Sequence, residues 1–127
     1  MEVKNLCKAY GDLPVLENVS FTVGVGVTAL WGPSGVGKTT LLRELVRCIS
    51  EGEGGPALRV GLTDERGEVA ALYGGMPQLE VGRRTDVIEG CSKARGAMLL
   101  LRAMNPQVLA MDEITAPEDV DALTAAA

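Results

Sequence analysis

One segment of eight residues constrains the fold of this chain more than any other. It fits the pattern G-x-x-x-x-G-K-[S/T] at every fixed position and consists of Gly32, Pro33, Ser34, Gly35, Val36, Gly37, Lys38 and Thr39. The apolar run at residues 27–31 predicts a buried strand before it, and the apolar spacing within residues 40–47 predicts a helix after it. A strand, a glycine-rich loop and a helix in this order predict a phosphate-binding P-loop.

The residue types of this loop suit a nucleoside triphosphate bound with Mg²⁺. Glycines let successive backbone N–H groups point inward at phosphate oxygens, and the N-terminus of the following helix adds partial positive charge. Lys38 can reach the β- and γ-phosphates, and the Thr39 hydroxyl can bind Mg²⁺. Thr40, at the start of the predicted helix, belongs to the same nucleotide-contacting set. The alternative, a glycine-rich turn before an ordinary helix, is disfavoured by the flanking pattern.

Composition excludes several kinds of site and partner. The chain has 127 residues, a net charge of −5 and no basic run, so nucleic acid is not expected as a direct partner. It has no histidine, and its three cysteines lack C-x-x-C spacing, which argues against zinc and against a disulfide framework. No apolar run is long enough to cross a bilayer, so membrane insertion is not expected. These features favour a reduced, cytoplasmic protein.

The order of predicted elements indicates an α/β fold. Apolar–polar alternation predicts a β-hairpin within residues 1–26, and residues 27–50 supply the strand, P-loop and helix. Residues 57–127 supply further strands and helices. This alternation predicts a single P-loop NTPase domain, residues 1–127, with a largely parallel sheet flanked by helices.

The second half of the chain contains two further apolar strand patterns, at residues 58–62 and 108–111. Helical spacing covers residues 93–104, and a last helix is expected from Pro117 to the terminus. Residues 69–92 have no clear pattern. In parallel α/β sheets, ligands bind at the carboxyl ends of the strands, so polar residues that follow these strands are candidate site residues.

The strand at residues 108–111 runs directly into Asp112 and Glu113, the pattern of a Walker B element. Asp112 would hold Mg²⁺, directly or through water, and Glu113 would orient or activate the attacking water. Taken alone, the pattern also fits a strand that ends in a solvated turn. Downstream of a P-loop, the Walker B interpretation is favoured.

Three carboxylates follow the other strand, at Asp64, Glu65 and Glu68. Near a Mg²⁺-triphosphate they could contact the metal shell or polarise water, while a charged surface turn explains them equally well. Four arginines could stabilise transition-state charge, and their spacing does not choose among them. They are Arg83, Arg84, Arg95 and Arg102.

Residues 1–47 resemble the start of an ABC-transporter ATPase domain. The likeness is carried by the segments Val3–Leu6, Lys8–Gly11, Val15–Phe21 and Gly32–Gly35. The resemblance implies that Tyr10 stacks on adenine, as an aromatic does in that family. A turn tyrosine that packs on its own hairpin is the alternative.

The remainder departs from that family. Residues 72–78 echo the ABC signature, but Tyr73 replaces its serine and the segment lies too far before Asp112. Ile114 stands where the family has proline after Asp-Glu, and no switch histidine follows.

Residues 35–127 instead resemble the stage III sporulation protein AA family, RecA-like ATPases related to secretion and pilus motors. The likeness is carried by residues 59–70, 75–78, 81–91, 104–108, 111–114 and 117–123. It implies that Asp64, Glu65 and Glu68 form the acidic box of secretion ATPases. It also implies ring-shaped homo-oligomers and a membrane-associated secretion partner, with the chain peripheral to the membrane.

The two likenesses meet at residues 37–43, so the chain is interpreted as a chimera joined at the P-loop. Later strands of the sporulation family are not present, and the domain is expected to be incomplete. The prediction is an ATPase that binds ATP and Mg²⁺, with catalytic residues Glu113, Lys38, Glu65 and Glu68. The alternatives are an ABC-transporter ATP-binding subunit and a nucleotide-binding fragment without turnover.

Overall fold

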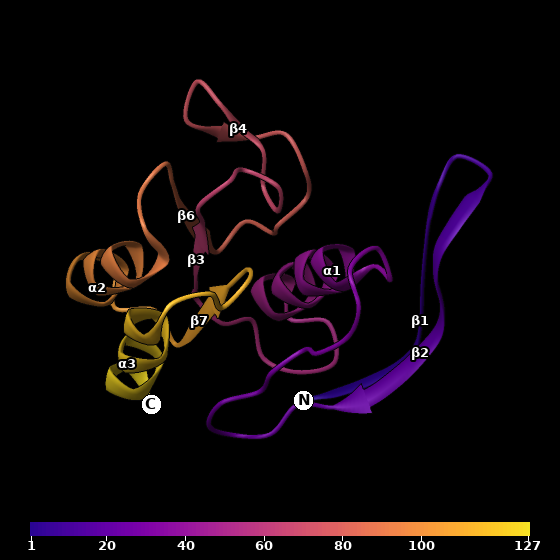
Figure 1. Cartoon of the computed structure of the whole chain (residues 1–127). Helices are drawn as coiled ribbons and strands as arrows, with labels where there is room; N and C mark the ends of the chain where they lie inside the picture. The colour runs from indigo at the N-terminus through magenta and orange to yellow at the C-terminus, as the bar shows by residue number, and fades with distance from the viewer.

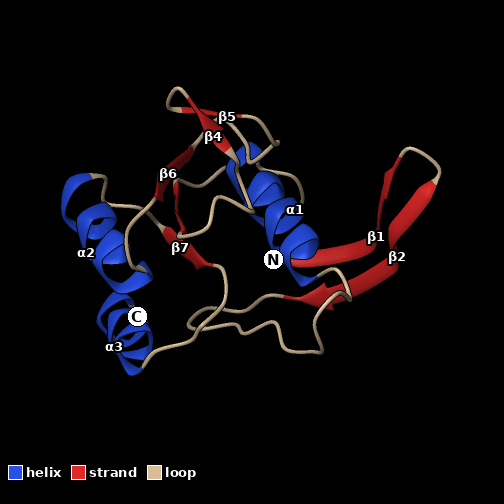
Figure 2. Cartoon of the chain, turned by 45° about the horizontal axis from the view of Figure 1, so that its top comes forward, coloured by secondary structure: helices blue, strands red, loops and turns tan.

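A parallel sheet of three strands forms the centre of the computed structural model, which describes residues 1–127. The elements are β1 (Glu2–Tyr10), β2 (Leu13–Thr22), α1 (Lys38–Glu51), β3 (Val60–Asp64), β4 (Leu72–Tyr73), β5 (Met76–Pro77), β6 (Thr85–Glu89), α2 (Lys93–Ala103), β7 (Val108–Met111) and α3 (Pro117–Ala126). The strand order is β6-β3-β7, and β3 runs parallel to both neighbours. Helix α1 covers one face, and α2 with α3 covers the other (Figures 1 and 2). The predicted α/β class with a parallel sheet flanked by helices is confirmed.

Strand β3 is buried along its whole length because helices cover both of its faces. Val60 and Leu62 belong to the main apolar core, together with Val46 of α1. On the other face, a side chain at Gly61 would lie 3.3 Å from Leu100 of α2. Small residues on this face therefore let α2 approach the sheet closely.

The N-terminal hairpin predicted within residues 1–26 is confirmed. Strands β1 and β2 pair antiparallel with several register shifts, and the hairpin projects away from the central sheet (Figure 1). Leu16 is its buried anchor, and Lys8 forms an ion pair of 3.0 Å with Glu44 of α1. These contacts attach the hairpin to the helix that follows the P-loop.

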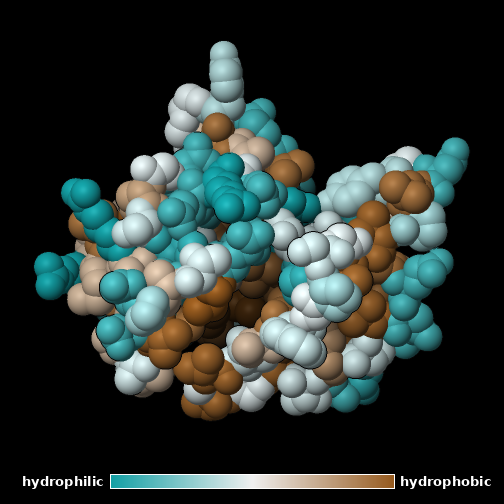
Figure 3. All heavy atoms as spheres, viewed as in Figure 1, coloured by the Kyte–Doolittle hydropathy of each residue, from teal (hydrophilic) through white to brown (hydrophobic).

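The prediction of a buried strand at residues 27–31 is wrong. The segment has no regular secondary structure, and Val27 and Trp31 are 62% and 97% exposed. An extended segment needs a neighbouring strand to bond its backbone groups, and this one pairs with no strand of the chain. Apolar residues line the hollow at the lower centre of Figure 3, between α3 and the hairpin.

Element boundaries elsewhere differ in two places. The strand expected at residues 58–62 is observed at Val60–Asp64, so Asp64 lies within the strand rather than after it. Residues 69–92, which had no clear pattern, contain β4, β5 and β6. The first two are only two residues long, too short for alternation to be visible in the sequence. The strand at residues 108–111 and the helices α2 and α3 are confirmed.

None of the helices combines the length and the apolar composition needed to cross a membrane.

Candidate functional site

The P-loop has the backbone geometry that its glycines permit. Gly35 and Gly37 have φ values of 81° and 96°, in the left-handed region that side chains disfavour. A side chain at Gly37 would also lie 3.3 Å from Val15 of the hairpin. Helix α1 begins immediately afterwards at Lys38, and its first turn contains no acidic residue. The N–H groups of this turn are therefore suited to an anion.

Lys38 is held by the loop that precedes it. Its Nζ donates hydrogen bonds to the carbonyl oxygens of Gly32 (2.7 Å) and Pro33 (2.6 Å). These contacts keep the ammonium group against the loop. From there it can exchange the two carbonyl oxygens for phosphate oxygens as hydrogen-bond acceptors. Nucleotide contact by Lys38, by the seven other P-loop positions and by Thr40 stays a prediction.

Thr39 and Asp112 come together from opposite halves of the chain. Burial raises the pKa of Asp112, and so do the nearby carboxylates of Glu113, Asp64 and Glu68. The nearby Thr39 side chain opposes this rise. The contact joins the first turn of α1 to the end of β7, which is the pairing that the sequence predicts for a Mg²⁺ site.

Asp64 organises the loop that carries the other acids. Its fully buried carboxylate accepts hydrogen bonds from the backbone N–H groups of Glu68 (2.9 Å), Val69 (3.1 Å) and Ala70 (2.8 Å). The hydrogen bonds of Asp64 therefore fix the shape of the loop. The position of Asp64 in the sequence does not reveal this role. Glu65 and Glu68 on the same loop are exposed.

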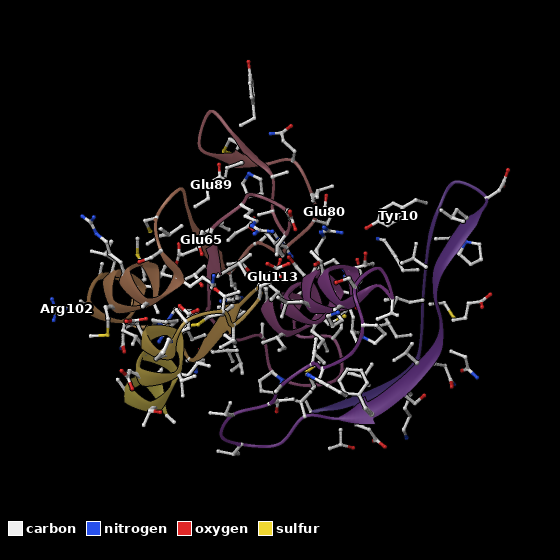
Figure 4. The ribbon with its side chains drawn as sticks, viewed as in Figure 1. Tyr10, Glu65, Glu80, Glu89, Arg102 and Glu113 are labelled. Atoms are coloured by element: carbon white, nitrogen blue, oxygen red, sulfur yellow. The ribbon has the colours of Figure 1, made fainter.

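A small cavity of about 100 Å³ lies at the carboxyl ends of β3 and β7. It is lined by Asp64, Glu65, Arg66, Lys93, Asp112, Glu113 and Thr115. Glu113 has a φ of 50° and pairs with Arg66 at 3.5 Å. Glu65 and Glu113 lie near each other at the centre of Figure 4. The structure thus brings together three of the predicted site residues, Glu65, Asp112 and Glu113.

Sequence reasoning missed two cations in this cavity, Arg66 and Lys93. Lys93 is 5% exposed and contacts Glu65 at 2.5 Å. One signal was available for it, since Lys93 is the only lysine after the P-loop. Of the four arginines that were considered, none lines the cavity. Arg83 pairs with Glu51 at 3.1 Å, and Arg102 points outward from α2 (Figure 4).

Tyr10 is attached to α1. Its hydroxyl oxygen accepts a hydrogen bond of 2.6 Å from Arg43, and Lys8 lies 5.8 Å from the centre of its ring. The ring is 44% exposed and lies on the hairpin side of α1 (Figure 4). Adenine stacking by Tyr10 stays a prediction.

Asp119 fixes the loop that follows Glu113. Its carboxylate accepts hydrogen bonds of 3.0 Å from the N–H groups of Thr115 and Ala116. Burial alone would raise the pKa of Asp119, but these two hydrogen bonds and Lys93 lower it below its ordinary value. Because the pKa of Asp119 is lowered in the folded protein, its charge stabilises the fold at pH values above the pKa that Asp119 has in the unfolded chain. This stabilisation is lost as the pH falls.

Asp119→Asn keeps an acceptor oxygen but removes the charge that Lys93 and the start of α3 stabilise, so it is expected to lower the free energy of unfolding by about 1 kcal/mol at pH 7. The difference from the wild type should shrink when urea unfolding is repeated below pH 3.8, the ordinary pKa of aspartate. Asp121→Asn, at an exposed position of α3, is the matched control. An Asp119 effect that is the same at both pH values would contradict this account.

Comparison with known proteins identifies the family. The model of the family described as "Sporulation stage III, protein AA" matches residues 9–127. The chain belongs to this family. A relative, the stage III sporulation protein AA of Bacillus subtilis (strain 168), is 45% identical over 97 residues, which cover 76% of this chain and 32% of that protein. The resemblance that the second half of the sequence indicated is confirmed.

ATP-binding subunits of importers also match. The phosphonates import ATP-binding protein PhnC 2 of Oceanobacillus iheyensis is 50% identical over 56 residues, covering 42% of this chain and 22% of that protein. The zinc import ATP-binding protein ZnuC of Paracoccus denitrificans is 34% identical over 137 residues, covering 83% of this chain and 53% of that protein. The chain thus spans about a fifth to a half of the length of these relatives. No solved structure matches it.

Proposed function

We propose that this chain binds Mg-ATP at the P-loop and hydrolyses it at the edge of the sheet where β3 and β7 end. The P-loop backbone and Lys38 hold the phosphates, and Thr39 with Asp112 holds Mg²⁺. Glu113 orients the attacking water and accepts its proton, and Glu65 and Glu68 support it. ATP is the nucleotide named for the importer relatives.

The contact between Thr39 and Asp112 is the observation that supports this proposal most. Thr39 follows the P-loop lysine, and Asp112 ends a strand more than seventy residues later in the chain. Their side chains lie close enough for Thr39 to lower the pKa of Asp112. A hydroxyl and a carboxylate placed in this way are the two protein ligands that P-loop enzymes give to Mg²⁺.

The available oxygen ligands suit Mg²⁺ when it arrives with a nucleotide. No group of three or more acidic or cysteine side chains is arranged to hold a metal by itself. Mg²⁺ commonly binds through one or two protein groups, with phosphate oxygens and water filling the other positions. Burial and then the neighbouring carboxylates raise the pKa of Asp112, and a cation beside these carboxylates would relieve their repulsion. When bound, the ion would neutralise charge on the phosphates.

Glu113 is placed to handle the proton of an attacking water. It is exposed at the rim of the cavity, and its partner Arg66 lies 3.5 Å away on the acidic loop. This ion pair keeps the Glu113 carboxylate near Glu65 and Asp112. A positioned general base contributes roughly 10²- to 10⁴-fold to a reaction of this kind.

Steady-state phosphate release tests the proposal. The purified chain should release phosphate from Mg-ATP, and Glu113→Gln should lower the rate at least about 100-fold because the amide cannot accept the proton. Glu118→Gln, at an exposed position of α3, should match the wild type. Release by the wild type that equals that of Glu113→Gln would refute hydrolysis.

The family suggests in which assembly the whole protein works. As the resemblance of residues 35–127 to secretion-type ATPases implies, subunits would assemble into a ring and drive a membrane-associated secretion complex. The chain would then be cytoplasmic and peripheral to the membrane through its partners. A chimera joined within residues 37–43 stays a proposal, since the family model matches residues 9–127 and therefore extends across that join.

A second candidate function is nucleotide binding without turnover. The observation that favours it is the unpaired segment at residues 27–31, which leaves the P-loop without a strand in the central sheet. The loop is then positioned only by α1 and the hairpin. Mg-ATP binding without phosphate release above that of Glu113→Gln would establish this alternative.

A further inference from the structure

Lys93 occupies a position that helix formation does not favour. It is the first residue of α2, after the N-cap Ser92, whose side chain accepts a hydrogen bond from the backbone of Arg95. Positive charge at a helix N-terminus is unfavourable, and the first turn of α2 contains no acid to offset it. Lys93 is nevertheless 5% exposed. A lysine buried at this place needs a reason other than the helix itself.

The partners of Lys93 supply that reason. Its Nζ lies 2.5 Å from Glu65 Oε2, 3.3 Å from the Thr115 hydroxyl and 3.9 Å from Asp119 Oδ2. One ammonium group thus connects three segments: the acidic loop after β3, the loop after Glu113, and the start of α3. The other charged groups that face the cavity are Asp64, Arg66, Asp112 and Glu113.

The side chains of Lys93 and its partners differ in how far they are exposed to solvent. The side chains of Lys93 and Asp119 are 6% and 4% exposed, whereas that of Glu65 is 43% exposed. Lys93 and Asp119 are therefore fixed by their burial, and the more exposed Glu65 side chain contacts Lys93 from the solvent side. Without Lys93, nothing else recorded in the structure bonds the Glu65 carboxylate.

We propose that Lys93 is a positioning residue that holds the Glu65 carboxylate at the cavity beside Asp112 and Glu113, an inference that rests on the proposed hydrolysis at this site. Lys93 acts through Glu65 and does not itself contact the nucleotide. Its effect is therefore on turnover rather than on Mg-ATP affinity.

The test is a double-substitution cycle with Lys93→Met and Glu65→Gln, measured as kcat and KM for phosphate release. Lys93→Met should lower kcat about tenfold and change KM less than twofold, because positioning affects the reacting geometry and not ground-state binding. In the Glu65→Gln background, the same substitution should change kcat less than twofold, since it acts through Glu65. Lys93→Arg keeps the charge and should recover most of the activity.

Lys4→Met is the matched control, because Lys4 is exposed on the hairpin and should leave kcat unchanged. An equal loss from Lys93→Met in both backgrounds would overturn the inference, as would no recovery in Lys93→Arg. Thermal unfolding of the same four cycle proteins, without nucleotide, tests the contact separately. Non-additive shifts of the midpoint support the Lys93–Glu65 contact, and additive shifts overturn it. If the wild type releases no phosphate above Glu113→Gln, the proposed function fails, and the unfolding cycle still decides the contact.

Discussion

Arg43→Met is expected to lower the free energy of unfolding by about 3 kcal/mol, because it leaves one buried and two partly buried acceptors without a donor. The Arg43 guanidinium is 7% exposed and donates to the carbonyls of Val69 (2.6 Å) and Glu68 (2.7 Å) and to the Tyr10 hydroxyl (2.6 Å). It thereby joins α1, the acidic loop and the hairpin. Thermal unfolding should show a midpoint roughly 10 °C lower.

Two companion variants separate these contacts. Tyr10→Phe removes only the hydroxyl and should cost about 1 kcal/mol. Arg102→Met, on the exposed side of α2, should change the midpoint little. A loss in Arg43→Met no larger than that in Arg102→Met would mean that Arg43 does not hold the acidic loop to the P-loop helix.

Asp112→Asn is expected to have opposite effects on the free and the nucleotide-bound chain. Without nucleotide it should raise the unfolding midpoint, because burial and the neighbouring carboxylates, which raise the pKa of Asp112, make its charge unfavourable. With Mg-ATP it should lose most of the added stability, since the amide is a poorer ligand for Mg²⁺. In the wild type that added stability is about 2.7 kcal/mol at a hundredfold excess over Kd.

The measurement is thermal unfolding with and without Mg-ATP, and Asp86→Asn, at an exposed position of β6, is the control. An Asp112→Asn protein that keeps the full Mg-ATP shift would exclude Asp112 as a metal ligand. One that is less stable than the wild type without nucleotide would contradict the repulsion argument.

Local patterns allowed part of this fold and site to be predicted from the sequence. The P-loop glycines, the hairpin alternation and the apolar run before Asp112 each lie within a few consecutive residues. The P-loop and Walker B patterns each supply one candidate metal ligand, and the pairing of Thr39 with Asp112 at Mg²⁺ stays a prediction. The acids at the ends of β3 and β7 share one cavity because parallel strands end at one edge of the sheet.

The remainder depends on contacts between distant segments. Residues 27–31 are apolar enough for a strand, but strand formation requires a neighbour, and none pairs with them. A lysine is normally expected at the surface, and only the packing of α2 against the acidic loop buries Lys93. Asp64 similarly shapes its own loop because β3 extends two residues further than predicted.

The most direct test of the central claim is thermal unfolding of the purified chain with and without Mg-ATP, beside Lys38→Ala. The account predicts one cooperative transition whose midpoint rises with Mg-ATP in the wild type. The rise should be absent in Lys38→Ala, which lacks the ammonium group that the P-loop holds against Gly32 and Pro33. A broad transition, or a wild-type midpoint that Mg-ATP does not change, would contradict the claim that both halves of the chain form one nucleotide site.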